Sequence, residues 1–265
     1  MINHKIDTIV FDGYNFSTKD STHQKRSGVA CQEVEINETN PCPANRKTFL
    51  GNYNNKERFV ASLANFLKER NFKVVECPSD ADTSIVKEAL RVAKTSSVVI
   101  YTDDTDILCL LLHHMAKDRS IKDIFMADMT KKKGQERSCY NVSQILERNK
   151  SIADIILFAH AFTGCDTTLS IYNLGKRSIF KIIEESQEMQ SLIKKFYEEK
   201  SPQQIGDTAI RLFEIIYSSD DSLASIREKK YEHMVLSNRA VIDPSMLPPS
   251  PRAAYYHYVY VYITK

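Results

Sequence analysis

The segment from Ser97 to Leu112 constrains the fold of this chain more than any other. It opens with the β-branched run Val98–Ile100, which predicts a fully buried strand. Three aspartates within four positions follow, and after them an apolar run predicts a helix. Clustered carboxylates at the end of a buried strand suit a hard-metal site at the carboxyl edge of a parallel sheet, where α/β proteins bind ligands. The alternative is that Asp103 or Asp104 caps the helix.

Further aspartates follow other predicted elements in the same way. Asp12 comes after the predicted strand Ile6–Phe11, and Asp166 comes after the predicted apolar helix Ile152–Phe162. Asp80 and Asp82 come after the predicted strand Phe72–Cys77 and open a helix that runs to about Lys94. Each has a structural alternative: a turn before Gly13, a capping box of Ser79 with Asp82, or a cap of the next helix for Asp166.

Strands and helices alternate in this part of the chain, which predicts an α/β fold. Right-handed crossovers bring the ends of parallel strands to one rim. Carboxylates gathered on one rim repel one another unless they bind cations. We therefore expect two Mg²⁺ or Mn²⁺ ions, which would activate water and hold the leaving oxygen in phosphodiester hydrolysis. The six carboxylates are Asp12, Asp80, Asp82, Asp104, Asp106 and Asp166.

Two groups of basic residues are candidates for phosphate contacts. Residues 14–50 show no clear period and predict a long polar loop or a partly disordered segment, in which Lys19 and Arg26 are seven positions apart. On a helix these two would share a face, as a phosphate clamp or as solvated surface. Lys176 and Arg177 follow Gly175 in a turn whose backbone N–H groups form a seat for one phosphate. His160, within an apolar helix, is interpreted as a structural histidine.

The other patterns predict packing elements. Residues 55–70 predict an amphipathic helix with Phe59, Leu63, Phe66 and Leu67 in the core, and residues 187–232 predict two or three more helices. The proline-rich residues 241–252 predict extended chain, and the alternation of Tyr255–Ile263 predicts a strand.

Composition excludes several classes. The net charge is +2, so nucleic-acid affinity must come from local patches. Six cysteines without a CxxC pair argue against a zinc ribbon. The absence of a recognisable signal peptide argues against a disulfide framework. No apolar run approaches about 20 residues, so no membrane span is expected. We expect an intracellular protein, the nucleus being favoured over the cytoplasm; the oligomeric state is left open.

The chain contains, in this order, VFDG, a Lys and an Arg seven positions apart, DAD, TDDTD, TGCD and LGKR. Over residues 5–185 this order of motifs resembles the flap-endonuclease/XPG superfamily of PIN-like 5′-nucleases. The full pattern, which also includes FLGN-NK and the C-terminal LPP-AA-H-VY, resembles still more closely a large group of PIN-like open reading frames, some associated with mobile elements. The resemblance implies a mostly parallel sheet flanked by helices, two divalent metals and cleavage of DNA or RNA.

The same resemblance implies a role for each candidate residue. Asp12 and Asp80 would hold the first metal with Asp82, Asp104 and Asp106 alongside, and Asp166 would belong mainly to the second. Lys19 and Arg26 match catalytic cations at the base of a helical arch. Gly164, Gly175, Lys176 and Arg177 lie in a region that resembles a helix–two-turn–helix, which grips a duplex with the help of a monovalent cation such as K⁺.

The implied domains are a PIN-like nuclease domain over residues 1–185, a helical extension over 186–240 and a Pro/Tyr-rich tail over 241–265. Within the first domain, 14–50 would form the arch-like loop and 163–185 the helix–two-turn–helix-like part. The family's first strand and its aspartate would precede Met1, and aspartates replace the family's glutamate pair at 80 and 82.

These departures give three interpretations: a fragment, a truncated gene model or an inactive copy. An inactive copy would be a nucleic-acid- or partner-binding module. A haloacid-type phosphotransferase is discounted, because Tyr14 stands where its second aspartate would be.

Overall fold

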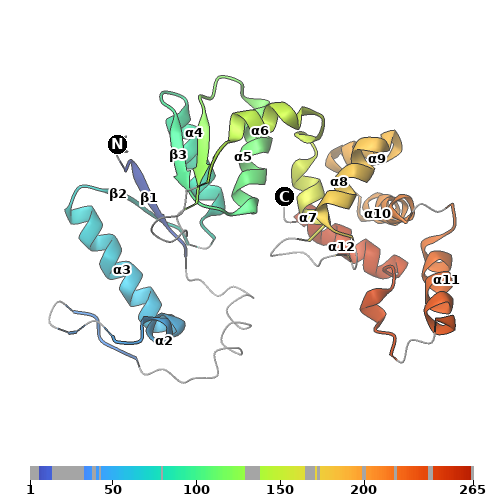
Figure 1. The fold of residues 1–265 in the computed structure, drawn as a ribbon, viewed down its shortest axis with the longest axis horizontal. Helices are drawn as coiled ribbons and strands as arrows, with labels where there is room; N and C mark the ends of the chain where they lie inside the picture. Colours follow the sequence, from blue (N-terminus) through green and yellow to red (C-terminus); the bar gives the residue numbers. More distant parts are fainter. Residues whose placement is uncertain are drawn as a thin grey trace. The chain divides into compact units, whose positions relative to one another are not determined.

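The computed structural model describes residues 6–13, 33–37, 40–41, 43–78, 80–128, 138–164, 171, 174–198, 201–217, 220–237 and 241–263. Over these residues the protein is α/β, with 11 α-helices, a two-stranded sheet and a three-stranded sheet (Figure 1). The chain divides into two compact units, Met1–Val92 (unit 1) and Ala93–Lys265 (unit 2). The coarse fold prediction is confirmed. No helix in the described ranges has the length and apolar character needed to cross a membrane.

Unit 1 contains a parallel pair of strands. β1 (Thr8–Phe11) and β2 (Lys73–Glu76) pair with Phe11 opposite Glu76, so their carboxyl ends lie at the same edge. The crossover that a parallel pair requires contains α2 (Arg46–Gly51) and α3 (Tyr53–Glu69), which begin after the asparagine caps Asn45 and Asn52. α4 (Asp82–Ala93) follows β2.

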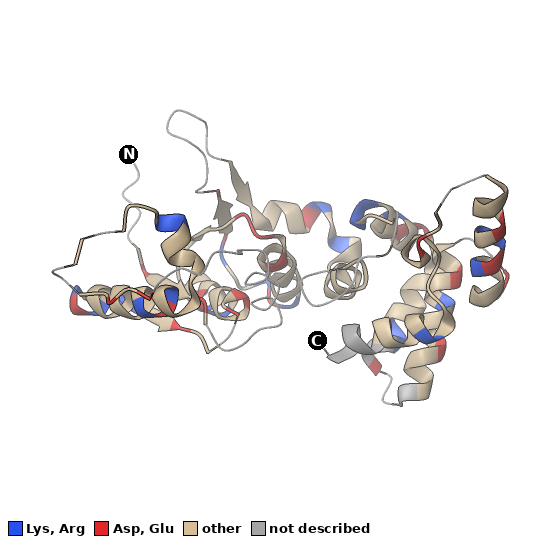
Figure 2. Ribbon diagram, turned by 90° about the horizontal axis from the view of Figure 1, so that it is seen from below, with Lys and Arg blue, Asp and Glu red and all other residues tan. Residues whose placement is uncertain are grey.

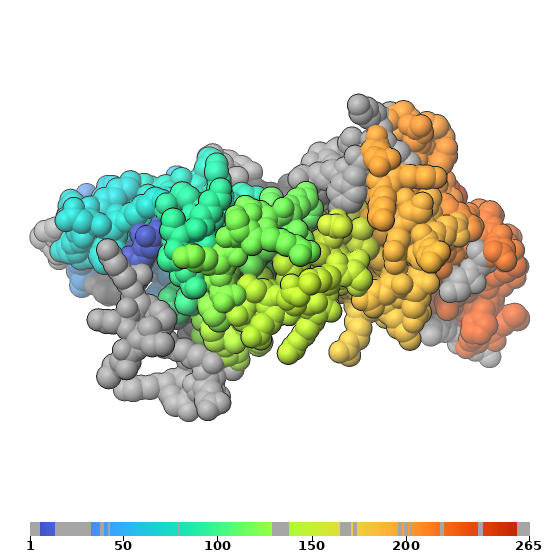
Figure 3. Space-filling model, turned by 90° about the horizontal axis from the view of Figure 1, so that it is seen from above, coloured from blue at the N-terminus to red at the C-terminus, as the bar shows by residue number. Residues whose placement is uncertain are grey.

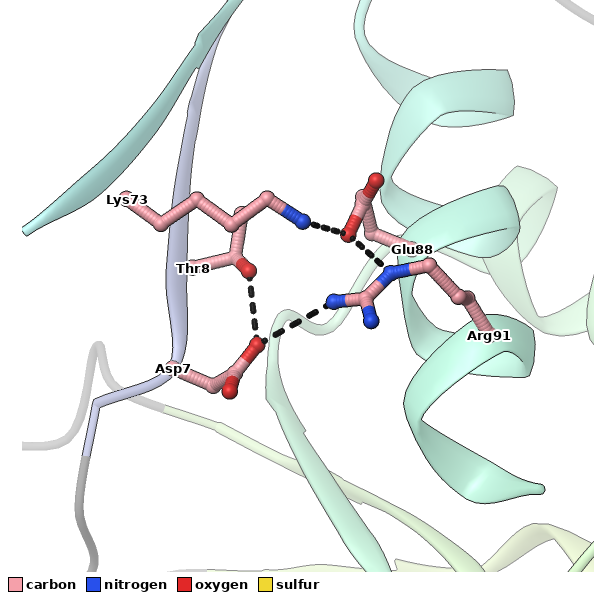
Figure 4. Close-up of polar contacts among 5 residues, drawn as sticks. All are labelled: Asp7, Thr8, Lys73, Glu88 and Arg91. Atoms are coloured by element: carbon pink, nitrogen blue, oxygen red, sulfur yellow. Dashed lines mark hydrogen bonds and ion pairs between the residues drawn. The ribbon is translucent and has the colours of Figure 1, made fainter. Parts of the chain in front are cut away.

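A polar network joins β1 and β2 to α4 (Figure 4). The carboxylate of Glu88 pairs with both Lys73 and Arg91. Arg91 also lies 3.5 Å from Oδ2 of Asp7, which accepts a hydrogen bond from Thr8 Oγ1 at 2.8 Å. The hydrogen bond from Lys73, and then that from Arg91, lowers the pKa of Glu88. Since these groups are partly solvated, we expect the network to orient α4 more than it stabilises the unit.

Two predictions for unit 1 are only partly right: the apolar stripe of residues 55–70 and the polar loop of residues 14–50. Phe59 and Phe66 were placed in the core, but they are 40% and 47% exposed, because α3 packs mainly on α2 and β2. Residues 46–50, predicted as polar loop, are helical in α2. Burial of Phe49, whose ring meets Phe59 edge-on at 6.4 Å, favours that helix.

The sheet of unit 2 is mixed. β3 (Val98–Tyr101) and β4 (Ile124–Ala127) are parallel and joined through α5 (Thr105–Lys117). β5 (Cys139–Asn141) is antiparallel to β4 and leads directly into α6 (Val142–Arg148). The prediction that β3 is fully buried is wrong, because only Ile100 is buried and Tyr101 is 46% exposed.

The rest of unit 2 is helical and shares one core. Phe158 and Phe162 of α7, Phe213 of α10 and Tyr258 of α12 are among its largest buried side chains. In the space-filling view the atoms of unit 2 pass from green through yellow to orange in chain order (Figure 3). The elements are η1 (Lys150–Ile152), α7 (Ile156–Phe162), α8 (Lys176–Glu185), α9 (Gln187–Glu198), α10 (Pro202–Ile216), α11 (Leu223–Leu236), η2 (Pro244–Met246) and α12 (Pro251–Ile263).

The predicted strand at Tyr255–Ile263 is wrong, because this segment belongs to helix α12. Ser250 Oγ accepts the N–H of Ala253 at 3.2 Å, and Pro251 is the first helical residue. Ala254 and Tyr258, one helical turn apart, are both fully buried. Packing against α10 overrides the strand-like alternation. The Ser-Pro pair is the helix-start signal that could have corrected the prediction. The predicted extended stretch also contains the short helix η2.

Candidate functional site

In unit 1 the predicted carboxylates gather where α4 begins. Asp12, directly after β1, accepts the backbone N–H of Ala81 on Oδ1 at 2.9 Å, although 69 positions separate them. Asp80 Oδ1 accepts the N–H of Asp82 at 3.1 Å. The parallel pairing of β1 and β2 therefore brings the carboxylate of Asp12 to the backbone between Asp80 and Asp82. Negative charge is favourable at such a helix start.

In unit 2 the TDDTD segment forms the start of α5. Asp104 is its N-cap: Oδ1 accepts the N–H of Asp106 at 2.8 Å. Thr102 Oγ1 accepts the N–H of Asp104 at 3.1 Å, which fixes the turn between β3 and α5. The capping interpretation of Asp104 is thus confirmed. It leaves room for a second role, because a carboxylate has four lone-pair sites and this cap uses one.

Asp106 belongs to a chain of polar contacts with His160 and Lys176. His160 Nε2 lies 2.9 Å from Asp106 Oδ1, and Lys176 Nζ lies 2.9 Å from His160 Nδ1. The Nε2–H direction is poorly aligned with the oxygen, so the first contact is electrostatic more than a good hydrogen bond. Burial, and then Lys176, lowers the pKa of His160, while Asp106 and Asp104 oppose this shift.

The contacts of His160 with Asp106 and Lys176 were not predicted from the sequence. His160 was interpreted as structural because it stands alone in an apolar helix. Its partners are 54 positions before and 16 positions after it, and no spacing rule links such positions. Only the packing of α7 against α5 and α8 reveals the contact.

Cys109 lies one turn after Asp106 on α5, and its thiol is partly buried. Burial raises its pKa to about 11, Lys176 lowers it, and Asp106 and Asp104 raise it further. Nucleophilic cysteines have the opposite shift. The raised pKa therefore does not favour Cys109 as a nucleophile.

The turn residues of the predicted nucleic-acid contact lie at the ends of α7 and α8. Gly164, with φ of 99°, follows the last turn of α7 and bonds back to Ala161 at 3.3 Å. Few residues other than glycine adopt this left-handed conformation, which ends the helix. Gly175 is the N-cap of α8. Of the two cations that follow it, Lys176 turns to His160 and Arg177 is exposed.

Three of the candidates, Lys19, Arg26 and Asp166, lie outside the described residues, as does Ser79 of the predicted capping box. The remaining carboxylates divide between the two units, so the single rim of six stays a prediction. Within the described ranges no group of three or more His, Cys, Asp or Glu side chains is placed to hold a metal. The donor chemistry nevertheless fits Mg²⁺, which usually needs one or two carboxylates plus waters and substrate phosphates.

His113, elsewhere on α5, makes stability depend on pH. Burial, then Lys117 and His114, lowers its pKa to about 4, and Asp154 opposes the shift. The unfolded chain, with an ordinary histidine pKa of about 6.5, therefore takes up the proton first as pH falls. This contribution is complete above about pH 6.5 and is lost between about pH 6.5 and 4, amounting to at most about 3 kcal/mol. Urea unfolding at about pH 7.5 and 4.5 measures it.

The matched variant for this prediction is His113→Leu. Because leucine does not titrate, the variant is expected to lose less stability than the wild type over the same pH range. Equal losses in the two proteins would assign the acid sensitivity to other groups, such as His114 and His257, whose pKa values are also lowered by burial.

Basic and acidic residues are mixed along helices α3 and α11. Blue and red segments are interspersed on α3 and α11 in Figure 2. Neither helix carries a stripe of one sign, which agrees with the small net charge. Any affinity for phosphate must therefore come from a local cluster.

Comparison with known proteins adds no assignment. No family model matches the chain, and neither a curated protein nor a solved structure shows significant similarity to it.

Proposed function

We propose that this chain is a metal-dependent nuclease with a PIN-like fold, which hydrolyses phosphodiester bonds in structured or single-stranded DNA or RNA. One observation carries the proposal: Asp12, at the carboxyl end of β1, reaches the backbone between Asp80 and Asp82, at the carboxyl end of the parallel strand β2. Ligands of α/β proteins bind at such strand ends. Asp104 and Asp106 follow β3 in the same way.

The proposed roles follow from the donor types. Asp12, Asp80 and Asp82 in unit 1, and Asp104 and Asp106 in unit 2, would hold Mg²⁺ or Mn²⁺. The metal supplies an activated water and stabilises the leaving oxygen. Lys176, Arg177 and the N–H groups after Gly175 would contact a substrate phosphate. Lys19 and Arg26 would steer the scissile phosphate, Asp166 would hold the second metal, and K⁺ would bind near Gly164, all by family resemblance.

A second candidate is a nucleic-acid-binding or partner-binding module without catalysis. It is favoured by the fact that Asp12, Asp80, Asp104 and Asp106 each already have a partner within the fold. A role as a helix cap accounts for a carboxylate at such a position without a bound metal. This module would bind DNA or RNA in a salt-dependent manner without turnover.

Incubation of the full chain with labelled flap DNA, single-stranded DNA and RNA tests the proposal. We expect cleavage with Mn²⁺ or Mg²⁺, none in EDTA, and none by Asp104→Asn. Asparagine is the right replacement because it caps helices as well as aspartate does but carries no charge. Wild-type binding without cleavage would select the module, and cleavage that survives Asp104→Asn would remove Asp104 from the metal site.

A further inference from the structure

Three helices of unit 2 each contribute one residue to a partly buried chain of polar contacts. Asp106 lies in the first turn of α5, His160 near the end of α7, and Lys176 at the start of α8. His160 separates the other two, with 2.9 Å from Nε2 to Asp106 Oδ1 and 2.9 Å from Nδ1 to Lys176 Nζ. The imidazole is only 7% exposed, so packing holds it in place.

The chemistry of lysine fixes the protonation of this ring. An ammonium group only donates hydrogen bonds, so Nδ1 of His160 must accept, and a neutral ring then carries its proton on Nε2. That proton is on the side of Asp106. Lys176 keeps two further N–H groups that His160 does not use.

The same contact leaves part of Asp106 available. Its Oδ1 faces His160, yet the side chain is 30% exposed. Within the described part of the chain, Oδ2 has no hydrogen-bond partner. A carboxylate with one oxygen in contact with a histidine, and with a second oxygen that accepts no hydrogen bond from the described residues, has the arrangement of a pre-oriented metal ligand.

We propose that His160 is a positioning residue, which holds Oδ1 of Asp106 so that Oδ2 is presented to a divalent cation, while Lys176 sets the tautomer of the ring. This inference rests on the proposed function, since it names the group that orients one of its metal ligands. His160 itself touches neither metal nor substrate. Loss of such an orienting partner typically weakens metal affinity 10–100-fold.

Titration of the full chain with Mn²⁺ alone tests this role. We expect His160→Leu to weaken Mn²⁺ binding about 10–100-fold. His160→Gln should restore most of the affinity, because its amide can accept from Lys176 and donate toward Asp106. The matched control is His113→Leu, another buried histidine replaced in the same unit, which should leave Mn²⁺ affinity unchanged. Thermal unfolding of each variant checks that it is folded.

Asp106→Asn separates this inference from the proposed function. If Asp106→Asn weakens Mn²⁺ binding and His160→Leu does not, the positioning role is overturned while the nuclease proposal stands. If Asp106→Asn leaves Mn²⁺ binding unchanged, Asp106 is no ligand and the inference fails; metal-dependent cleavage by the wild type then decides separately whether the nuclease proposal survives.

Nitrogen-15 NMR of the folded wild type supplies a readout that needs no variant at His160. At neutral pH we expect a neutral ring protonated on Nε2, and Lys176→Met should disturb that tautomer whereas Arg177→Met should not. A ring protonated on Nδ1, or on both nitrogens, would overturn the inference even if His160→Leu fails to fold.

Discussion

Phe162→Ala is expected to lower the free energy of unfolding by about 3–5 kcal/mol. The ring is fully buried, with centroids 5.2 Å from Phe158, 5.0 Å from Phe213 and 5.3 Å from His257. It therefore joins α7 to α10 and α12 in the core of unit 2. Alanine loses both the burial and the aromatic contacts, each pair of which contributes about 0.5–1.5 kcal/mol beyond its area.

Urea unfolding followed by circular dichroism measures the effect. The hydrogen bond from His257 Nε2 ends on the backbone carbonyl of Phe162, at 2.9 Å, and so remains available in the variant. The matched control is Phe66→Ala, since that ring is 47% exposed on α3 and should cost well under half as much. Equal losses would mean that the core of unit 2 is not organised around Phe162.

The strands could be predicted because their signals are local. Thr8–Phe11, Lys73–Glu76 and Val98–Tyr101 all lie in or overlap the β-branched or apolar runs that predicted them. Parallel pairing of β1 with β2 was likewise implied by the helices between them. Short β-branched or apolar runs that are bounded by turn residues are therefore sufficient to predict most of a strand.

The positions of two aromatic groups could not be predicted, because they depend on tertiary packing. Tyrosine and valine alternate around Tyr258 as they would in a strand. In helix α12, however, Tyr258 and Ala254 lie on the same side, against α10. Phe59 and Phe66 have helical spacing, yet α2 and β2 cover only part of α3. The spacing of apolar residues shows which of them share a face of a helix, but it does not show which other element packs on that face.

The candidate site was predictable in its carboxylates and not in its histidine. Asp12 and Asp104 follow strands, so chain order alone places them at strand ends. The role of His160 depends on α7 and α8 bringing it between Asp106 and Lys176, which is a property of the folded core. Such contacts leave no local pattern in the sequence.

Asp12→Asn is expected to reduce metal-dependent cleavage about 100-fold or more while leaving stability nearly unchanged. Asparagine keeps an Oδ1 that accepts the N–H of Ala81, so the start of α4 stays satisfied. It removes the negative charge that a Mg²⁺ ligand supplies. Because loss of a ligand's supporting partner already costs 10–100-fold, loss of the ligand's charge should cost at least the upper value.

Asp12→Ala separates the metal role from the capping role. Alanine also removes the acceptor for the Ala81 N–H, so this variant should lose cleavage and in addition about 0.5–2 kcal/mol of unfolding free energy. Asp7→Asn is the control, because Asp7 lies at the amino end of β1, where it pairs with Thr8 and Arg91, and not at the carboxyl ends of the strands. Its cleavage should match the wild type. Should Asp12→Asn cleave normally while Asp12→Ala is destabilised, Asp12 is a helix cap alone, and the metal site must be built from other carboxylates.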